Sequence, residues 1–285
     1  MKRGTFFLFV GPSVIIMMSL MILPLFAATW LGFNYITFRN ITEPRFVGLQ
    51  NYSGVLTDPQ FWSALRFTIL YVAVTVPARI VIGFVIALLL DQVTHLRGIF
   101  IAGTLLPYIV TPVVGTLIYR DAFAKAGLYT YLIERLFDYR LFFDQETVRT
   151  LILLHGVWVA TPFAMIVLFA GLQTLPKEPI EAAIVDGATW LQRLWYVVIP
   201  HLRSLFIFTA LIGTMDAYRV FDSVFVLSQQ NPTYDASLMT YNFRVALSYG
   251  RLGKANAMSI ITVIGIFVVL IPWLYMTYRE QVEER

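Results

Sequence analysis

Three charged residues recur at a regular spacing within one apolar stretch of the sequence. Asp216, Arg219 and Asp222 are each three positions apart, so on a continuous helix they would form an acid–base–acid ribbon that climbs about 9 Å along one side. Arg219 would then pair with both carboxylates and fix the rotation of the helix. This interpretation treats the ribbon as a neutral structural network.

A fourth charge, Arg79, lies in another apolar stretch shortly after Pro77, with no acidic residue within one helical turn. Three interpretations remain open for this guanidinium. It pairs across helices with Asp216 or Asp222, it contributes positive potential to a path for a solute, or it faces water at a helix break.

The residues that usually perform catalysis or bind metals are scarce. The sequence has no cysteine, which excludes thiol catalysis, disulfides and Cys-ligated clusters. The three histidines, His95, His155 and His201, are too far apart for a short metal motif such as H-E-x-x-H. With no histidine next to an acid, no Asp pair spaced to share one proton and no activated nucleophile, an intramembrane enzyme is disfavoured.

The composition is that of a membrane protein. Hydrophobic residues make up 58% and charged residues only 13% of the 285 residues, against about 25% charged in soluble domains. The net charge of +4 is spread along the chain without a Lys/Arg block, so nucleic-acid binding is not expected. In such a chain, a charge at mid-membrane costs about 2.5–3.5 kcal/mol on insertion scales, which makes these four charges functional candidates.

Six stretches are long and apolar enough to cross a bilayer core, which needs around 20 helical residues. They cover approximately residues 6–33, 67–90, 99–119, 150–172, 203–227 and 255–278. Runs of this length and composition form helices rather than barrel strands. Lipid offers no hydrogen-bond partners, so the backbone amides of a span must bond within the protein, as they do in a helix. We therefore predict an all-α, polytopic membrane protein in which residues 1–285 form a single transmembrane domain.

The orientation of the spans is only partly indicated by charge. An even number of spans puts both termini on one side, and Lys2 and Arg3 suggest that this side is the cytoplasm. Basic residues are divided almost equally between the two sets of loops, so the loops do not decide the matter. The same basic start would suit a cleaved signal peptide, but the apolar run is longer than the core of one.

The loop at about residues 176–200 is too polar to span the membrane and too rich in helix formers to be a plain linker. Glu178 and Pro179 are typical of a helix start, because a carboxylate complements the dipole and Pro is tolerated in the first turn. Gly187 permits a sharp reversal, after which a second short amphipathic helix is expected. The loop is either a docking element for another protein or an interfacial helix that caps the bundle.

The sequence of this loop, EAAIVDGATWLQRLWYVVIP, resembles the EAA loop of the permease subunits of binding-protein-dependent ABC importers. Seven residues carry the match: Glu181, Ala182, Ala183, Asp186, Gly187, Ala188 and Pro200. In that family the loop is cytoplasmic and docks into a cleft of an ATPase subunit. The resemblance therefore implies that these residues, with Leu191 and Ile199, form the ATPase contact.

Other motifs resemble the carbohydrate-importing branch of the same family. The segment FVGLQNY at residues 46–52, followed by DPQFW at residues 58–62, is similar to the signature after the first span of those sugar permeases. Leu106-Pro107 and the segment RVFD at residues 219–222 also match that branch. The similarity extends along nearly the whole chain and implies the type I ABC importer permease fold.

The resemblance also implies a set of partners. The working assembly would contain this chain, a second and different permease chain, two ATPase subunits and an extracytoplasmic substrate-binding protein, in the bacterial cytoplasmic membrane with both termini cytoplasmic. The sequence has no G-x-x-x-x-G-K-[ST] motif. We therefore expect no cofactor in this chain and no enzymatic activity of its own, with ATP and Mg²⁺ bound by the partner ATPases.

The fourth and fifth spans line the sugar path in this family, and a sugar needs both polar groups for its hydroxyls and aromatic faces for its C–H surface. Aromatic residues in such spans are nevertheless more often packing than ligand. The candidates for the path are Arg79, Trp158, Thr161, Phe163, Asp216, Tyr218, Arg219 and Asp222.

The four intramembrane charges sum to zero, which favours a neutral sugar as the cargo, with an anionic sugar derivative as the alternative. A stand-alone secondary transporter is a further alternative, but the two halves of the chain show no internal repeat.

Overall fold

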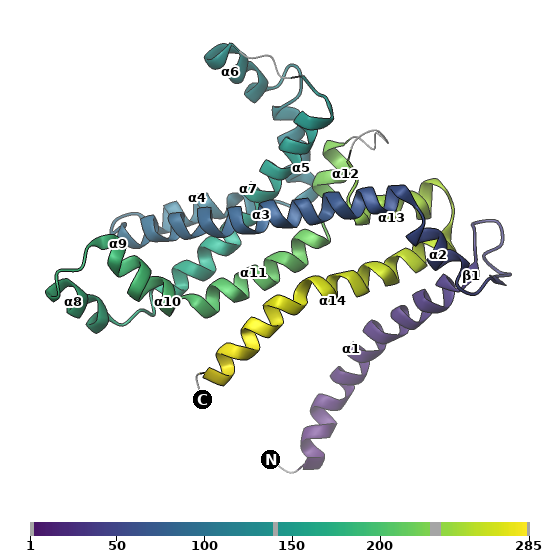
Figure 1. The fold of residues 1–285 in the computed structure, drawn as a ribbon, viewed down its shortest axis with the longest axis horizontal. Helices are drawn as coiled ribbons and strands as arrows, with labels where there is room; N and C mark the ends of the chain where they lie inside the picture. Colours follow the sequence, from purple (N-terminus) through teal and green to yellow (C-terminus); the bar gives the residue numbers. More distant parts are fainter. Residues whose placement is uncertain (1–2, 139–141, 229–234, 284–285) are drawn as a thin grey trace. The chain divides into compact units, whose positions relative to one another are not determined.

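The computed structural model describes residues 3–138, 142–228 and 235–283 (Figure 1). Helices dominate these residues, and only one short pair of strands joins them. In chain order the elements are α1 (Arg3–Gly32), β1 (Asn34–Tyr35), β2 (Arg45–Phe46), α2 (Gln50–Leu56), α3 (Pro59–Gln92), α4 (Arg97–Ile109), α5 (Pro112–Ala122), α6 (Leu128–Phe137), α7 (Gln145–Leu172), α8 (Lys177–Val185), α9 (Trp190–Arg193), the π-helix η1 (Leu194–Val198), α10 (Ile199–His201), α11 (Arg203–Tyr218), α12 (Asp222–Leu227), α13 (Leu238–Phe243), the π-helix η2 (Arg244–Ser248) and α14 (Leu252–Glu283).

The helices confirm the predicted all-α membrane fold. Four of them, α1, α3, α7 and α14, contain stretches long and apolar enough to cross a membrane. Two bent pairs, α4 with α5 and the segment 190–201 with α11, meet the same requirement when each pair is taken together. Six spans are therefore reached only if each bent pair counts as one.

The third predicted span, residues 99–119, is not one straight helix. The chain leaves the helical conformation at Val110 and Thr111, whose ψ angles are 134° and 130°, and α5 begins at Pro112. A residue before proline is disfavoured in the helical conformation, so Pro112 ends α4 early and opens α5. The two helices meet at 95°.

The fifth predicted span, residues 203–227, is also divided. Helix α11 ends at Tyr218, the backbone of Arg219 has φ −95° and ψ 16°, and α12 begins at Asp222. The prediction of one continuous helix carrying Asp216, Arg219 and Asp222 is therefore wrong. The acid–base–acid ribbon does not exist as a helical face, because its last member lies beyond the break.

The chain divides into two compact units, and the first comprises residues 1–62 and 238–267. Its strands pair antiparallel, with Asn34 opposite Phe46 and Tyr35 opposite Arg45. The amide of Asn51, from the FVGLQNY motif, donates to the carbonyls of Gly32 and Asn34 at 2.9 Å each. This motif therefore fixes how the chain leaves α1.

The DPQFW motif of the first unit ties α3 to the C-terminal part of the chain. The Asp58 carboxylate accepts hydrogen bonds of 2.6 Å from both the Tyr241 hydroxyl and the Lys254 ammonium, and one of 3.0 Å from the Gln60 amide. Burial acts to raise the pKa of Asp58, but the bonds from Lys254, Tyr241 and Gln60 outweigh it and lower the pKa. Burial, reinforced by the bond to Asp58, raises the pKa of Tyr241.

The second unit comprises residues 63–237 and 268–285 and contains α7 packed against α4, α11 and α12. Small residues allow these close approaches: Gly83 of α3 lies against Ala164 of α7, and Gly156 of α7 lies against the ring of Tyr71. Two apolar clusters result, one around Tyr71 and Ile152 and one around Phe84, Met165 and Leu168.

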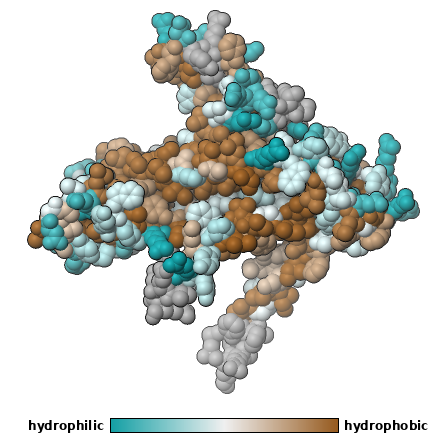
Figure 2. Space-filling view, viewed as in Figure 1, coloured by the Kyte–Doolittle hydropathy of each residue, from teal (hydrophilic) through white to brown (hydrophobic). Residues whose placement is uncertain are grey.

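The surface of the second unit changes character along its length. Hydrophobic residues cover much of α3 and α4 in Figure 2, while α8 and α9 carry a mixture of hydrophilic and hydrophobic residues. The loop between α7 and α11 therefore has the mixed surface predicted for a segment outside the membrane.

Candidate functional site

The loop at residues 176–200 begins with α8, which runs from Lys177 to Val185 as the sequence predicts. The helix ends at Val185, and Gly187, two residues later, has a φ of +76° in the left-handed region. The Ala188 amide then donates to the Ala183 carbonyl at 2.9 Å, which satisfies a carbonyl that the helix end leaves without a partner. The predicted sharp reversal at Gly187 is confirmed, and any other residue there would be strained.

The second half of the loop starts with a capping box that the sequence analysis missed. The Thr189 hydroxyl and the Gln192 side chain cap each other's backbone amides, with the Thr189 amide donating to Gln192 Oε1 at 2.7 Å. The chain continues through η1 and α10, and the segment 190–201 meets α11 at 65°. The T-x-x-Q spacing at Thr189 is the sequence signal for this start.

The loop exposes large apolar side chains rather than burying them. Val185 is 87% and Tyr196 is 80% exposed, and four other large apolar residues are also exposed: Ile184, Trp190, Leu191 and Trp195. Of the nine residues predicted to contact an ATPase, Ala183, Ala188 and Ile199 are half-buried and the others are exposed: Glu181, Ala182, Asp186, Gly187, Leu191 and Pro200. An exposed apolar patch with a polar rim is typical of a surface that another protein covers.

Arg79, in the middle of α3, is buried with only 6% of its surface exposed. Its Nε and Nη2 atoms have no hydrogen-bond partner among the described residues. The guanidinium lies against the backbone of Gly213 in α11, where the Cβ of any other residue would collide with it. Of the three interpretations left open for Arg79, the pairing with Asp216 or Asp222 is not formed among the described residues.

Asp216 instead pairs with Arg219, whose Nη2 donates to Oδ1 at 3.0 Å. This pair is exposed, with 57% of the Asp216 and 61% of the Arg219 side chain accessible. Tyr218, which the sequence places beside these charges, is instead fully buried. The three residues therefore do not present one common surface to a solute.

Trp158 and Thr161 of α7 line one cavity of about 390 Å³, which α3 and α4 also bound. The Thr161 hydroxyl donates to the Val157 carbonyl at 2.6 Å, so only its lone pairs remain for a ligand. Phe163 does not line this cavity and stacks on Tyr108, with ring centroids 6.3 Å apart. The structure thus brings Trp158 and Thr161 together and separates Phe163 from them.

No protein-family model matches the chain, but curated relatives match most of its length. The trehalose/maltose transport system permease protein MalF of Thermococcus litoralis is 30% identical over 278 residues, which are 94% of this chain and 92% of that protein. The trehalose transport system permease protein SugA of Mycobacterium tuberculosis is 30% identical over 243 residues, 85% of this chain and 78% of that protein. The chain belongs to the carbohydrate ABC transporter permeases.

A solved structure confirms the fold of this permease. A subunit of the bacterial alginate ABC transporter, crystallised in complex with an alginate pentasaccharide-bound periplasmic protein, matches with a TM-score of 0.83. The match covers 98% of this chain and 95% of that chain at 18% identity. The chain therefore has the fold of an ABC importer permease, as the sequence predicts.

The permease also contains a buried polar pair that the sequence analysis did not select. His155 of α7 and Ser223 of α12 are hydrogen-bonded at 2.8 Å between Nδ1 and Oγ, and His155 Nε2 has no partner among the described residues. His155 also meets Tyr119 edge to face, with centroids 4.9 Å apart. Nothing in the local sequence marks this pair, because 68 residues separate its members.

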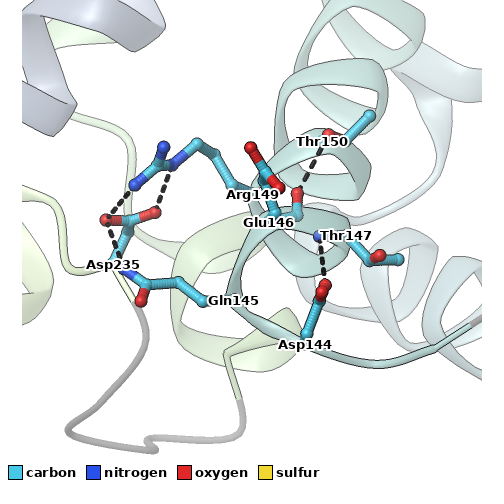
Figure 3. A network of polar contacts seen from close by, with 7 residues as sticks. All are labelled: Asp144, Gln145, Glu146, Thr147, Arg149, Thr150 and Asp235. Atoms are coloured by element: carbon cyan, nitrogen blue, oxygen red, sulfur yellow. Dashed lines mark hydrogen bonds and ion pairs between the residues drawn. The ribbon is translucent and has the colours of Figure 1, made fainter.

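A second long-range pair joins the start of α7 to the segment before α13 in the permease. Figure 3 shows Arg149 and Gln145 of α7 directed at the carboxylate of Asp235. Asp144 caps the same helix by accepting from the Thr147 amide at 2.8 Å, and this bond lowers the pKa of Asp144. The first turn of α7 is thus fixed both by its cap and by Asp235.

Proposed function

We propose that this permease forms part of the translocation path of an ATP-driven sugar importer and that its α8–α9 loop transmits ATP hydrolysis to that path. The observation that carries the coupling role is the exposed apolar patch formed by Ile184, Val185, Trp190, Leu191, Trp195 and Tyr196. Large apolar side chains outside a membrane span are costly to leave in water. An ATPase subunit that covers them removes this cost.

The proposed assembly has four kinds of protein component. This chain pairs with a second, different permease chain, two ATPase subunits bind ATP and Mg²⁺, and an extracytoplasmic binding protein delivers the sugar. With the α8–α9 loop on the ATPase side, the loop and both termini are cytoplasmic. This permease then holds no cofactor of its own.

A substitution in the apolar patch tests the coupling role. Val185→Asp places a charge at the most exposed apolar position of the loop, so we expect the ATPase subunits no longer to co-purify with the permease. Leu49→Asp is the matched control, because Leu49 is also exposed but lies before α2, which the proposed topology assigns to the extracytoplasmic side. Retention of the ATPase subunits by Val185→Asp would refute the proposed contact.

Arg79 supports a more specific proposal for the cargo. A neutral sugar requires no buried cation, and no ion pair neutralises Arg79 among the residues that the structure describes. Nε and Nη2 form one edge of the guanidinium, the edge that binds a carboxylate, sulfonate or phosphate group with two hydrogen bonds. An anionic sugar derivative is therefore the second candidate cargo, beside the neutral sugar favoured by the zero sum of the four charges.

The cavity lined by Trp158 and Thr161 is a separate candidate for contact with the sugar, and Arg79 does not line it. Trp158 offers an aromatic face, and the Thr161 hydroxyl oxygen can still accept a hydrogen bond. Uptake of a panel of radiolabelled neutral and anionic sugars by cells with and without the transporter decides between the two cargo classes.

A further inference from the structure

The turn between α3 and α4 is held by the side chain of Arg97, the first residue of α4. Its Nε donates to the Val93 carbonyl and its Nη2 donates to the Asp91 carbonyl, at 2.9 Å each. Both carbonyls belong to the chain that leaves α3. Arg97 therefore closes the turn and fixes the start of α4 against the end of α3.

The same turn is joined to the end of α7 by side-chain contacts. The Gln173 side-chain amide donates to the Asp91 carboxylate at 2.6 Å, and its oxygen accepts from Arg97 Nη1 at 3.4 Å. The Arg97 guanidinium also lies over the Phe169 ring, 5.3 Å from the ring centroid, in a cation–π contact. Because Phe169 and Gln173 are four residues apart, they lie on the same face of α7. The α3–α4 turn is thus attached to one face of the end of α7.

Both ends of the α8–α9 loop meet this same end of α7. The loop begins directly after it, and the Thr174 hydroxyl lies 3.4 Å from Nε2 of His201, at the other end of the loop. Gly171 lies so close to the Leu202 and Leu205 side chains that a Cβ at position 171 would collide with both. Figure 1 shows α9 and α10 at the same end of the second unit as the turn between α3 and α4. A movement of the loop therefore acts directly on the end of α7.

We propose that Gln173 and Arg97 are positioning residues that pass a movement of the α8–α9 loop from the end of α7 to α4. The inference rests on the coupling role proposed for the loop and names the route by which that coupling reaches the path. Helix α4 packs against α7 and forms one wall of the cavity lined by Trp158 and Thr161. If the α3–α4 turn and the end of α7 move as one body, a movement of the loop changes the position of that wall.

Removal of the Gln173 amide tests this route in the reconstituted transporter. Asp91 and Gln173 are both exposed, so Gln173→Met should leave folding and assembly with the ATPase subunits intact. We expect the amount of sugar taken up per ATP hydrolysed to fall about five-fold or more, the lower end of typical coupling between sites. Gln92→Met is the matched control and should keep the ratio of the unaltered transporter. Gln92 is likewise exposed, is the last residue of α3 and takes no part in these contacts.

A reversible cross-link tests whether the two turns move together. In the cysteine-free chain, Asp91→Cys combined with Gln173→Cys removes the hydrogen bond. A short bifunctional methanethiosulfonate then replaces it with a covalent link that a reductant breaks. We expect the double variant to lose coupling as Gln173→Met does, to regain it when cross-linked and to lose it again after reduction. Because one assembled sample passes through all three states, a difference in folding or yield does not produce this result.

Three results would overturn the proposed route. An unchanged ratio of sugar to ATP in Gln173→Met would show that the contact transmits nothing, and failure of this variant to assemble would assign the contact to folding instead. A cross-link that stops uptake would show that the two turns move relative to each other. Val185→Asp separates these failures from failure of the proposed function. If Val185→Asp loses the ATPase subunits while Gln173→Met keeps the normal ratio, the loop contact stands and only the route is refuted.

Discussion

The Arg149 guanidinium makes two hydrogen bonds to the Asp235 carboxylate, at 2.5 and 3.1 Å, although 86 residues separate the two in sequence. Only 10% of the Asp235 side chain is exposed, so loss of Arg149 would leave a largely buried carboxylate without its cation. We expect Arg149→Met to lower the stability of the permease by about 1–2 kcal/mol, since the pair is partly solvated.

Thermal unfolding of the purified permease measures this effect. Arg120→Met is the control, because Arg120 pairs with its exposed neighbour Asp121 and such pairs contribute about 0–1 kcal/mol. A double-mutant cycle with Asp235→Leu isolates the pairwise energy. Additive effects of the two substitutions would show that the Arg149–Asp235 contact contributes nothing.

The bonds that Asp58 accepts predict an acid-sensitive link in the first unit. Because the pKa of Asp58 is lowered in the folded chain, the folded state holds this proton less tightly than the unfolded state, where Asp titrates near 3.9. The stabilisation is complete above about pH 5 and is lost as the pH falls below about 4.

Melting temperatures between pH 3 and pH 7 test this link. Asp58→Asn should lower the stability at pH 7 and make the melting temperature less dependent on pH in the acidic range. Asp121→Asn, at an exposed position, should leave the dependence on pH as it is in the unaltered protein. An Asp58→Asn curve parallel to that of the unaltered protein would contradict the role of this carboxylate.

Gly187 can be tested against a glycine with the same backbone conformation. Gly187 and Gly48 have φ of +76° and +58°, and a Cβ at either would meet no atom of the described chain within 4 Å. Gly187→Ala and Gly48→Ala should therefore each cost about 1 kcal/mol of strain. Only the first, and more strongly Gly187→Trp, should uncouple ATP hydrolysis from substrate arrival.

Uptake and ATPase activity measured on the same reconstituted samples separate strain from coupling. If Gly187→Trp assembles and transports at the rate of the unaltered protein, the α8–α9 loop does not transmit ATP hydrolysis. Equal loss of coupling in Gly48→Ala would attribute the effect to strain alone.

The proposed topology is testable because the chain has no cysteine. Single cysteines at Thr189 and Glu43 should be labelled from opposite sides by a membrane-impermeant thiol reagent, Glu43 from outside and Thr189 only after lysis. The six-span topology with cytoplasmic termini also places Tyr139 and Tyr234 outside; both lie beyond the described residues and can be labelled in the same way. Labelling of position 189 in intact cells would overturn the orientation.

The fold was largely predictable because length and apolarity alone define a membrane span. The reversal at Gly187 was predictable too, since a glycine after a short helical pattern is a strong local signal. The breaks after Ile109 and Tyr218 were not predicted. Pro112 is the sequence signal for the break after Ile109. It was missed because Pro112 lies within an apolar run, and the span was defined by hydropathy alone.

The candidate path was less predictable than the loop. No residue that disfavours a helix marks the break at Arg219 in the sequence. The ribbon was inferred from a regular helical spacing, and the backbone does not keep that spacing at the break. The Arg79–Gly213 contact joins two distant helices, so no local pattern encodes it. Long-range pairs such as His155–Ser223 depend on packing and were missed for the same reason.

Arg79 permits a test in which stability and transport respond differently. Nε and Nη2 of Arg79 have no hydrogen-bond partner within the described chain. Burying this guanidinium therefore costs free energy that no hydrogen bond from these atoms offsets. Arg79→Met should therefore keep or raise the melting temperature of the assembled transporter. If the charge attracts an anionic cargo, uptake of an anionic sugar should fall by at least ten-fold while uptake of a neutral sugar is unchanged.

The control for this test is Arg66→Met, because Arg66 is exposed on the same helix. It should alter neither stability nor uptake. A lower melting temperature for Arg79→Met would instead show that another subunit pairs with Arg79, because removing its cation would then leave a buried carboxylate alone. Normal stability and normal uptake of every sugar in Arg79→Met would remove Arg79 from the path, and with it the case for an anionic cargo.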